Sequence, residues 1–74
     1  MKTSITINTD FIKLEQALKL SALAETGGIA KAMIQDGIVS VNGEVSTQRG
    51  KKCRVGDKIE IAFEDELAII LVEG

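Results

Sequence analysis

Residues 26–43, TGGIAKAMIQDGIVSVNG, decide the fold that this sequence predicts. The segment opens with Thr26, whose hydroxyl can cap a helix by accepting a free backbone N–H of the first turn. It closes with Asn42-Gly43, the dipeptide most typical of a tight β-turn. Between them we expect one short amphipathic helix, with Gly37 in the left-handed conformation that ends many helices. The segment therefore predicts a helix that leads directly into a β-hairpin.

The first turn of this helix carries the functional clue. At about 100° per residue, Gly27, Gly28 and Lys31 share the solvent side of the helix. The apolar arc lies on the other side and consists of Ile29, Ala30, Met33 and Ile34. Free N–H groups at a helix N-terminus favour an anion, and two glycines leave a phosphate room to approach. The alternative is that the glycines only make a tight turn between helices and that Lys31 is an ordinary solvated side chain.

Length and composition limit the class of protein. The chain has 74 residues, so we expect one domain over residues 1–74 with a small core. Hydrophobic residues make up 45% and charged residues 27%, which is typical of a folded chain rather than a disordered one. No apolar run is long enough for a membrane span, and the N-terminus lacks the apolar core of a signal peptide. A single cysteine excludes a disulfide framework, so the cytoplasm is the expected compartment.

Charge is distributed unevenly along the chain, whose formal net charge is −2. Residues 49–58 hold five basic groups and one acidic group, which gives +4, whereas residues 59–74 hold five acidic groups and no basic one, which gives −5. Local field decides what a surface attracts. We therefore interpret the four cations of residues 49–54 as a site for a polyanion, and we call them the basic loop: Arg49, Lys51, Lys52 and Arg54. The alternative is a lysine-rich edge that prevents aggregation between strands.

The N-terminal part of the chain predicts a strand and a first helix. Residues 3–8 alternate as a half-buried strand. Thr9 or Asp10 is expected to cap a helix that begins at Phe11. Its apolar stripe consists of Phe11, Leu14, Ala17, Leu18 and Ser21. Glu15 and Lys19 are expected to form an i,i+4 pair on its exposed strip.

The segment after the second helix is expected to form strands. At the Asn42-Gly43 turn we expect a three-residue loop that pairs Val39 with Val45. A two-residue hairpin would instead pair Ser40 with Val45 and mix the two faces. Residues 48–54 are expected to be a loop or an edge, and residues 55–58 and 64–66 to be turns. The strands that follow those turns are marked by the alternation of Ile59, Ile61 and Phe63 and by the apolar run 67–72.

The order of elements is therefore β-α-α-β-β-β-β. This order predicts an α+β fold in which two consecutive helices pack on a small, mostly antiparallel β-sheet.

Two segments, ETGGIAKAMIQDGIVSVNGEV (25–45) and RGKKCRVGDKIEI (49–61), resemble the S4 RNA-binding domain. The resemblance is carried by Thr26, Ala30, Met33-Ile34, Gly37, Val39-Ser40-Val41-Asn42-Gly43 and Gly56-Asp57, and it covers about residues 11–63. Many members of this family place an arginine after the hydroxyl residue, where this chain has Gly27. The TGG-x-AK pattern with RGKK downstream is similar to the short stand-alone bacterial branch of YaaA/YbcJ-like proteins, which carry an extra N-terminal strand.

The resemblance implies both a fold and a partner. The fold is S4-like, an alpha-L motif with extra N- and C-terminal strands. The partner is structured RNA, ribosomal or transfer RNA, bound through phosphate-backbone and shape contacts in ribosome assembly or translation, with the ribosome itself as a further partner. Lys31 and the basic loop then take over the role of the missing arginine. The residues expected to bind RNA are Thr26, Gly27, Gly28, Lys31, Arg49, Lys51, Lys52 and Arg54.

The aromatic and reactive residues narrow the function further. There is no Trp or Tyr, and Phe11 and Phe63 are expected in the core, which leaves no aromatic surface for stacking single-stranded bases. Without histidine, neither a His-based triad nor a common metal site can be built. Cys53 is expected to be a packing residue, the alternative being a redox-active thiol of lowered pKa. We expect no enzyme, no metal, no cofactor, no small-molecule substrate and no membrane partner.

Two other functions remain open at this point. A small α+β chain that ends in glycine is similar to ubiquitin-like sulfur carriers, but those need a Gly-Gly tail and this chain ends Val72-Glu73-Gly74. The acidic C-terminal half could also serve a protein–protein adaptor.

Overall fold

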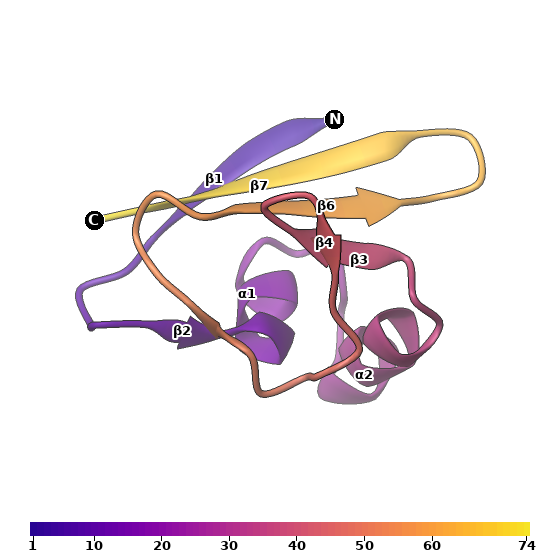
Figure 1. Ribbon diagram of the computed structural model, residues 1–74, viewed down its shortest axis with the longest axis horizontal. Helices are drawn as coiled ribbons and strands as arrows, with labels where there is room; N and C mark the ends of the chain where they lie inside the picture. Colours follow the sequence, from indigo (N-terminus) through magenta and orange to yellow (C-terminus); the bar gives the residue numbers. More distant parts are fainter.

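The computed structural model describes all residues 1–74 and shows a five-stranded sheet with two helices against one of its faces (Figure 1). The elements are β1 Lys2–Thr6, β2 Ile12–Lys13, α1 Leu14–Leu20, α2 Gly27–Gln35, β3 Val39–Val41, β4 Glu44–Val45, β5 Lys52–Cys53, β6 Lys58–Ala62 and β7 Leu67–Glu73. The strand order in the sheet is β1-β7-β6-β3-β4, while β2 and β5 form a separate two-stranded ribbon. Only β1 and β7 are parallel, so the predicted fold class, two helices on a mostly antiparallel sheet, is confirmed.

The core lies between the inner face of the sheet and the helices. Strand β6 buries Ile59 and Ile61, and the neighbouring β7 buries Ile70, because alternate residues of a strand point to the same face. The helices contribute fully buried side chains such as Leu18 of α1 and Ile34 of α2. Burying one such side chain contributes about 1.5–3 kcal/mol, so this layer is the main source of stability. No helix is long and apolar enough to cross a membrane.

The predicted register of the first hairpin is wrong. The turn has two residues, Asn42 at φ +52° and Gly43 at φ +88°, and Ser40 pairs with Val45. Positive φ at both central residues is the type I′ geometry whose twist matches that of the flanking strands. Mixing the faces costs little here, because β4 is an edge strand and Val45 is exposed while Val39 still faces the core.

The predicted start of the first helix is also wrong. Helix α1 begins at Leu14 rather than at Phe11, because residues 12 and 13 pair with β5 as strand β2. Lys13 occupies the N-cap position and makes no side-chain capping bond. The hydroxyl of Thr9 donates to the carbonyl of Phe11 at 2.8 Å instead of capping a helix. The separate β2–β5 ribbon is absent from the predicted order of elements.

Three predictions about single side chains are wrong as well. Phe11 is half-buried rather than part of the core, and Phe63 is 37% exposed because it lies just beyond the end of β6. Ile29 is exposed although the other three members of its apolar arc are buried. Glu15 and Lys19 form no ion pair, because neither belongs to the two ion pairs of the structure.

The segment that decides the fold behaves otherwise as predicted. The side chain of Thr26 caps α2, and Gly37 follows the helix at φ +79°, in the left-handed region. The turn predicted at residues 55–58 contains Gly56 at φ +96°, and its last residue, Lys58, already begins β6.

Candidate nucleic-acid interface

The N-terminus of α2 is an exposed turn with free backbone donors. The Oγ1 atom of Thr26 accepts a hydrogen bond from the N–H of Ile29 at 3.1 Å, which leaves the amides of Gly27 and Gly28 without a capping partner. Gly28 is exposed and a Cβ there would meet only the Thr26 hydroxyl, at 3.8 Å. The first turn itself holds no acidic residue, and its free N–H groups favour an anion.

One acid from the other helix adjoins this turn. A Cβ added at Gly27 would lie 3.0 Å from the Oε1 atom of Glu15, which belongs to α1. Glycine at this position therefore leaves space for the carboxylate, and any side chain here would displace it. The sequence does not predict this contact of Glu15, because nothing in a linear pattern places residue 15 beside residue 27.

The backbone of the basic loop is fixed on the first helix. The amides of Leu14 and Glu15 donate to the carbonyls of Lys51 and Arg49, at 2.8 and 3.0 Å. These carbonyls satisfy two of the four donors that every helix leaves free at its start, which explains why α1 needs no side-chain cap. The loop carries its cations on an ordered backbone as a result.

The β2–β5 ribbon adds a cation, Lys13, that the sequence does not predict as part of the site. Lys13 lies opposite Lys52, and Ile12 lies opposite Cys53. Opposed residues of an antiparallel pair share a face. Cys53 is buried and Ile12 packs against the core, so the two lysines both point to solvent. Like charges placed opposite one another destabilise a strand pair, and an anion bound between them would remove this cost.

None of these cations has an acidic partner within 4.0 Å. The two ion pairs of the structure lie elsewhere, at Met1–Glu66 and Lys58–Glu60. The ammonium of Lys52 instead lies over the Phe11 ring, 4.9 Å from its centroid.

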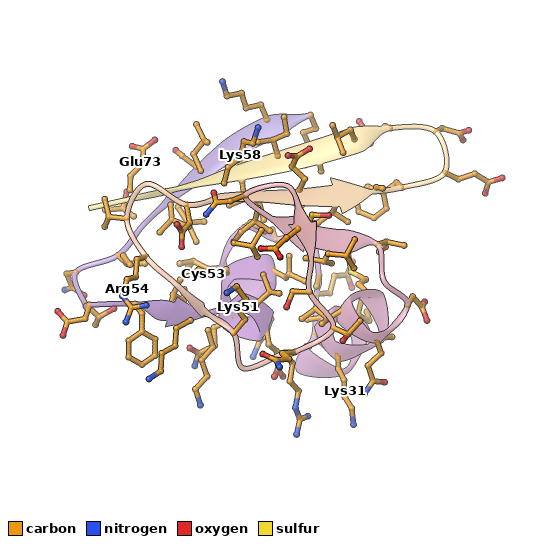
Figure 2. All side chains as sticks on the ribbon, in the orientation of Figure 1. Lys31, Lys51, Cys53, Arg54, Lys58 and Glu73 are labelled. Atoms are coloured by element: carbon orange, nitrogen blue, oxygen red, sulfur yellow. The ribbon has the colours of Figure 1, made fainter.

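The structure brings the two groups of predicted RNA-binding residues onto one part of the surface. Glu15 links them, because its amide bonds to Arg49 of the basic loop while its carboxylate adjoins Gly27 of α2. Figure 2 shows Lys31 on α2 and Arg54 at the end of the ribbon, with Lys51 between them. We call the exposed side chains of Lys13, Lys31, Arg49, Lys51, Lys52 and Arg54 the basic surface.

The far end of the basic loop is held by Asp57. Its carboxylate accepts from the backbone N–H of Arg54 at 2.7 Å and from the side-chain amide of Asn42 at 3.0 Å. The hydrogen bond from the Arg54 backbone is the largest of the effects that lower the pKa of Asp57. Partial burial raises this pKa, whereas the Asn42 amide and the charges of Lys51 and Arg54 lower it further. This turn ties the loop to the first hairpin.

Cys53 faces the core, as predicted. Burial raises the pKa of its thiol to about 11, the charge of Asp57 raises it too, and Lys51 opposes them. The thiol is therefore protonated near neutral pH and is not the low-pKa nucleophile that its basic neighbours suggested. No group of three or more Cys, Asp or Glu side chains is placed to hold a metal ion.

Comparison with known proteins identifies the family. The model of the S4 domain matches residues 5–70. A Bacillus subtilis (strain 168) protein described as "Probable ribosome maturation protein RlbA" is 43% identical over 61 residues, which cover 82% of this chain and 86% of that protein.

A solved structure shares the fold. The trimeric structure of Heat Shock Protein 15 from Vibrio cholerae superposes with a TM-score of 0.75 at 22% identity, over 86% of this chain and 64% of that chain. The two-helix and hairpin segment, the cations around it and the match over residues 5–70 lead to one assignment: this chain belongs to the S4 domain family.

Proposed function

We propose that this chain binds structured RNA through contacts with the phosphate backbone and with the shape of the RNA. The observation that carries the proposal is the basic surface, whose cations have no carboxylate within 4.0 Å and whose loop is fixed on α1 by backbone hydrogen bonds. Membership of the S4 family supports RNA as the polyanion. A cationic side chain on an ordered backbone, without a carboxylate partner, gains more free energy from binding a phosphate than one that must first give up such a partner.

In this proposal one phosphate lies at the start of α2. The exposed amide of Gly28 and the ammonium of Lys31, one turn further on, hold it. The carboxylate of Glu15 lies on the Gly27 side of the turn and restricts the phosphate to the Gly28 side. The basic loop continues the contact along the RNA backbone, and Thr26 holds the turn in shape through its cap.

The kind of RNA follows from what the surface can read. Phosphate contacts carry no sequence information, so discrimination between RNAs depends on their shape. The similarity to a protein described as a ribosome maturation protein supports ribosomal RNA as the partner, in the assembly of ribosomes and in the cytoplasm. We propose a binding module rather than an enzyme.

The test compares two RNAs of equal length in gel-shift titrations: a folded fragment of ribosomal RNA, and poly-uridine, which has no stable structure. The proposal expects the folded RNA to bind more tightly at every salt concentration. Equal affinity for both, or no binding to either, contradicts it. Sequencing of the RNA crosslinked to the protein in cells then identifies the natural partner.

A further inference from the structure

An aromatic ring and three exposed cations lie on or directly beside the β2–β5 ribbon. Lys13 lies opposite Lys52, and both are exposed. Phe11 directly precedes β2, and the exposed Arg54 directly follows β5. The ammonium of Lys52 lies over the Phe11 ring, 4.9 Å from its centroid, which places the ring beside the exposed lysines of the ribbon.

The ring is held in place but only partly covered. Phe11 is half-buried, and its backbone is fixed by the hydroxyl of Thr9, which donates to the Phe11 carbonyl at 2.8 Å. The side chain above the ring is a flexible lysine with no acidic partner. A cation over a ring at an exposed site is a weak contact, so another flat group can replace it.

We propose that the Phe11 ring is a stacking platform for one unpaired base of the bound RNA. Every base has a flat face that stacks on an aromatic side chain, and a basic groove around such a ring is the usual arrangement in single-strand binding. Lys52 leaves the ring for the phosphate of the stacked nucleotide, while Lys13 and Arg54 contact the flanking phosphates. This inference rests on the proposed function and adds a preference for RNA in which a base stands free beside a helix.

The unpaired base is a requirement of the geometry. Inside a duplex both faces of a base are covered by its neighbours, so no ring can reach them. A bulged or terminal nucleotide leaves one face free. The other aromatic residue, Phe63, cannot serve, because it lies next to Glu64, Asp65 and Glu66 and far along the chain from the cations.

The experiment uses two RNA hairpins that differ only in one bulged nucleotide, with 2-aminopurine at the bulge. Phe11→Leu keeps an apolar side chain without a ring, Phe11→Tyr keeps the ring, and Phe63→Leu is the matched control. We expect Phe11→Leu to weaken binding of the bulged hairpin by roughly 5- to 150-fold while hardly changing the paired one. Phe11→Tyr and Phe63→Leu should bind both hairpins as the wild type does.

Fluorescence of the 2-aminopurine decides the question even if Phe11→Leu does not fold. Stacking quenches its emission, so the wild type and Phe11→Tyr should quench the bulged hairpin. Binding of the wild type without quenching overturns the stacking platform and leaves the proposed function standing. Equal loss for both hairpins in a folded Phe11→Leu variant overturns it too. Failure of the wild type to bind either hairpin contradicts the proposed function itself.

Discussion

Substitution of Asn42 by alanine should lower the free energy of unfolding by about 2–5 kcal/mol. The side chain makes two hydrogen bonds, donating to Asp57 Oδ1 at 3.0 Å and accepting from the N–H of Lys58 at 2.9 Å. Each is worth roughly 0.5–1.5 kcal/mol net. The backbone at φ +52° adds a further loss of about 1–2 kcal/mol, because alanine resists the left-handed region that asparagine tolerates.

Thermal and denaturant unfolding measure this effect, and a loss of that size lowers Tm by on the order of 10 °C or more in a domain of this length. Asn42→Gly is the matched control, because glycine loses the same two hydrogen bonds but adopts the positive φ freely. The glycine variant should be more stable than the alanine variant by about 1 kcal/mol. Equal stability of the two variants would refute the argument from φ, and a wild-type Tm for both would refute the role of the two bonds.

Three further substitutions test neighbouring parts of the account. Gly43→Val should destabilise the chain by about 1–2 kcal/mol through backbone strain at φ +88°, since no atom lies within 4 Å of the added Cβ; an unchanged thermal melt would contradict the type I′ turn. Cys53→Ala should change stability modestly and leave RNA affinity intact, and a folded variant that loses RNA binding would show a functional thiol. The native thiol, whose pKa is about 11, should react with a disulfide reagent at pH 8 only after the protein unfolds. The pKa of Asp57 is lower in the folded state than in the unfolded chain, so the contribution of Asp57 to the free energy of unfolding is present above about pH 4 and is lost as the pH falls through the folded pKa. Asp57→Asn should therefore lose less stability in acid than the wild type does. Identical pH profiles of stability for the two proteins would contradict this prediction.

The parts of the fold that were predictable from sequence are those governed by local signals. The cap at Thr26, the left-handed Gly37 and the alternation of Ile59 and Ile61 each act within a few residues, so the second helix and the central strand were readable. The hairpin register was not, because a contact from Asn42 to a turn 15 residues away favours the two-residue turn.

The first helix shows the same limit, and it affects the candidate site. Strands of two residues that pair across about forty positions carry no periodicity, so Ile12 and Lys13 looked like part of a helix. For that reason the sequence does not predict Lys13 as a member of the basic surface, and it places Phe11 in the core. The cations of the basic loop were found because their density in sequence is itself the signal.

The salt dependence of RNA binding tests the central claim most directly. Contacts with about four to six phosphates give a slope of log K against log salt of roughly −3 to −5. Lys31→Ala and Lys51→Ala should each flatten this slope by about one unit and weaken all structured RNAs alike. Lys2→Ala is the control. Lys2 is exposed, forms no ion pair, and lies on β1, the edge strand of the sheet opposite β4, so it is not part of the basic surface.

The titration uses a folded fragment of ribosomal RNA and the wild type beside these three variants. Reduced slopes for Lys31→Ala and Lys51→Ala, with a wild-type slope for Lys2→Ala, are the predicted result. Wild-type slopes for the first two variants, or a slope for Lys2→Ala as flat as theirs, would show that RNA does not bind at the basic surface.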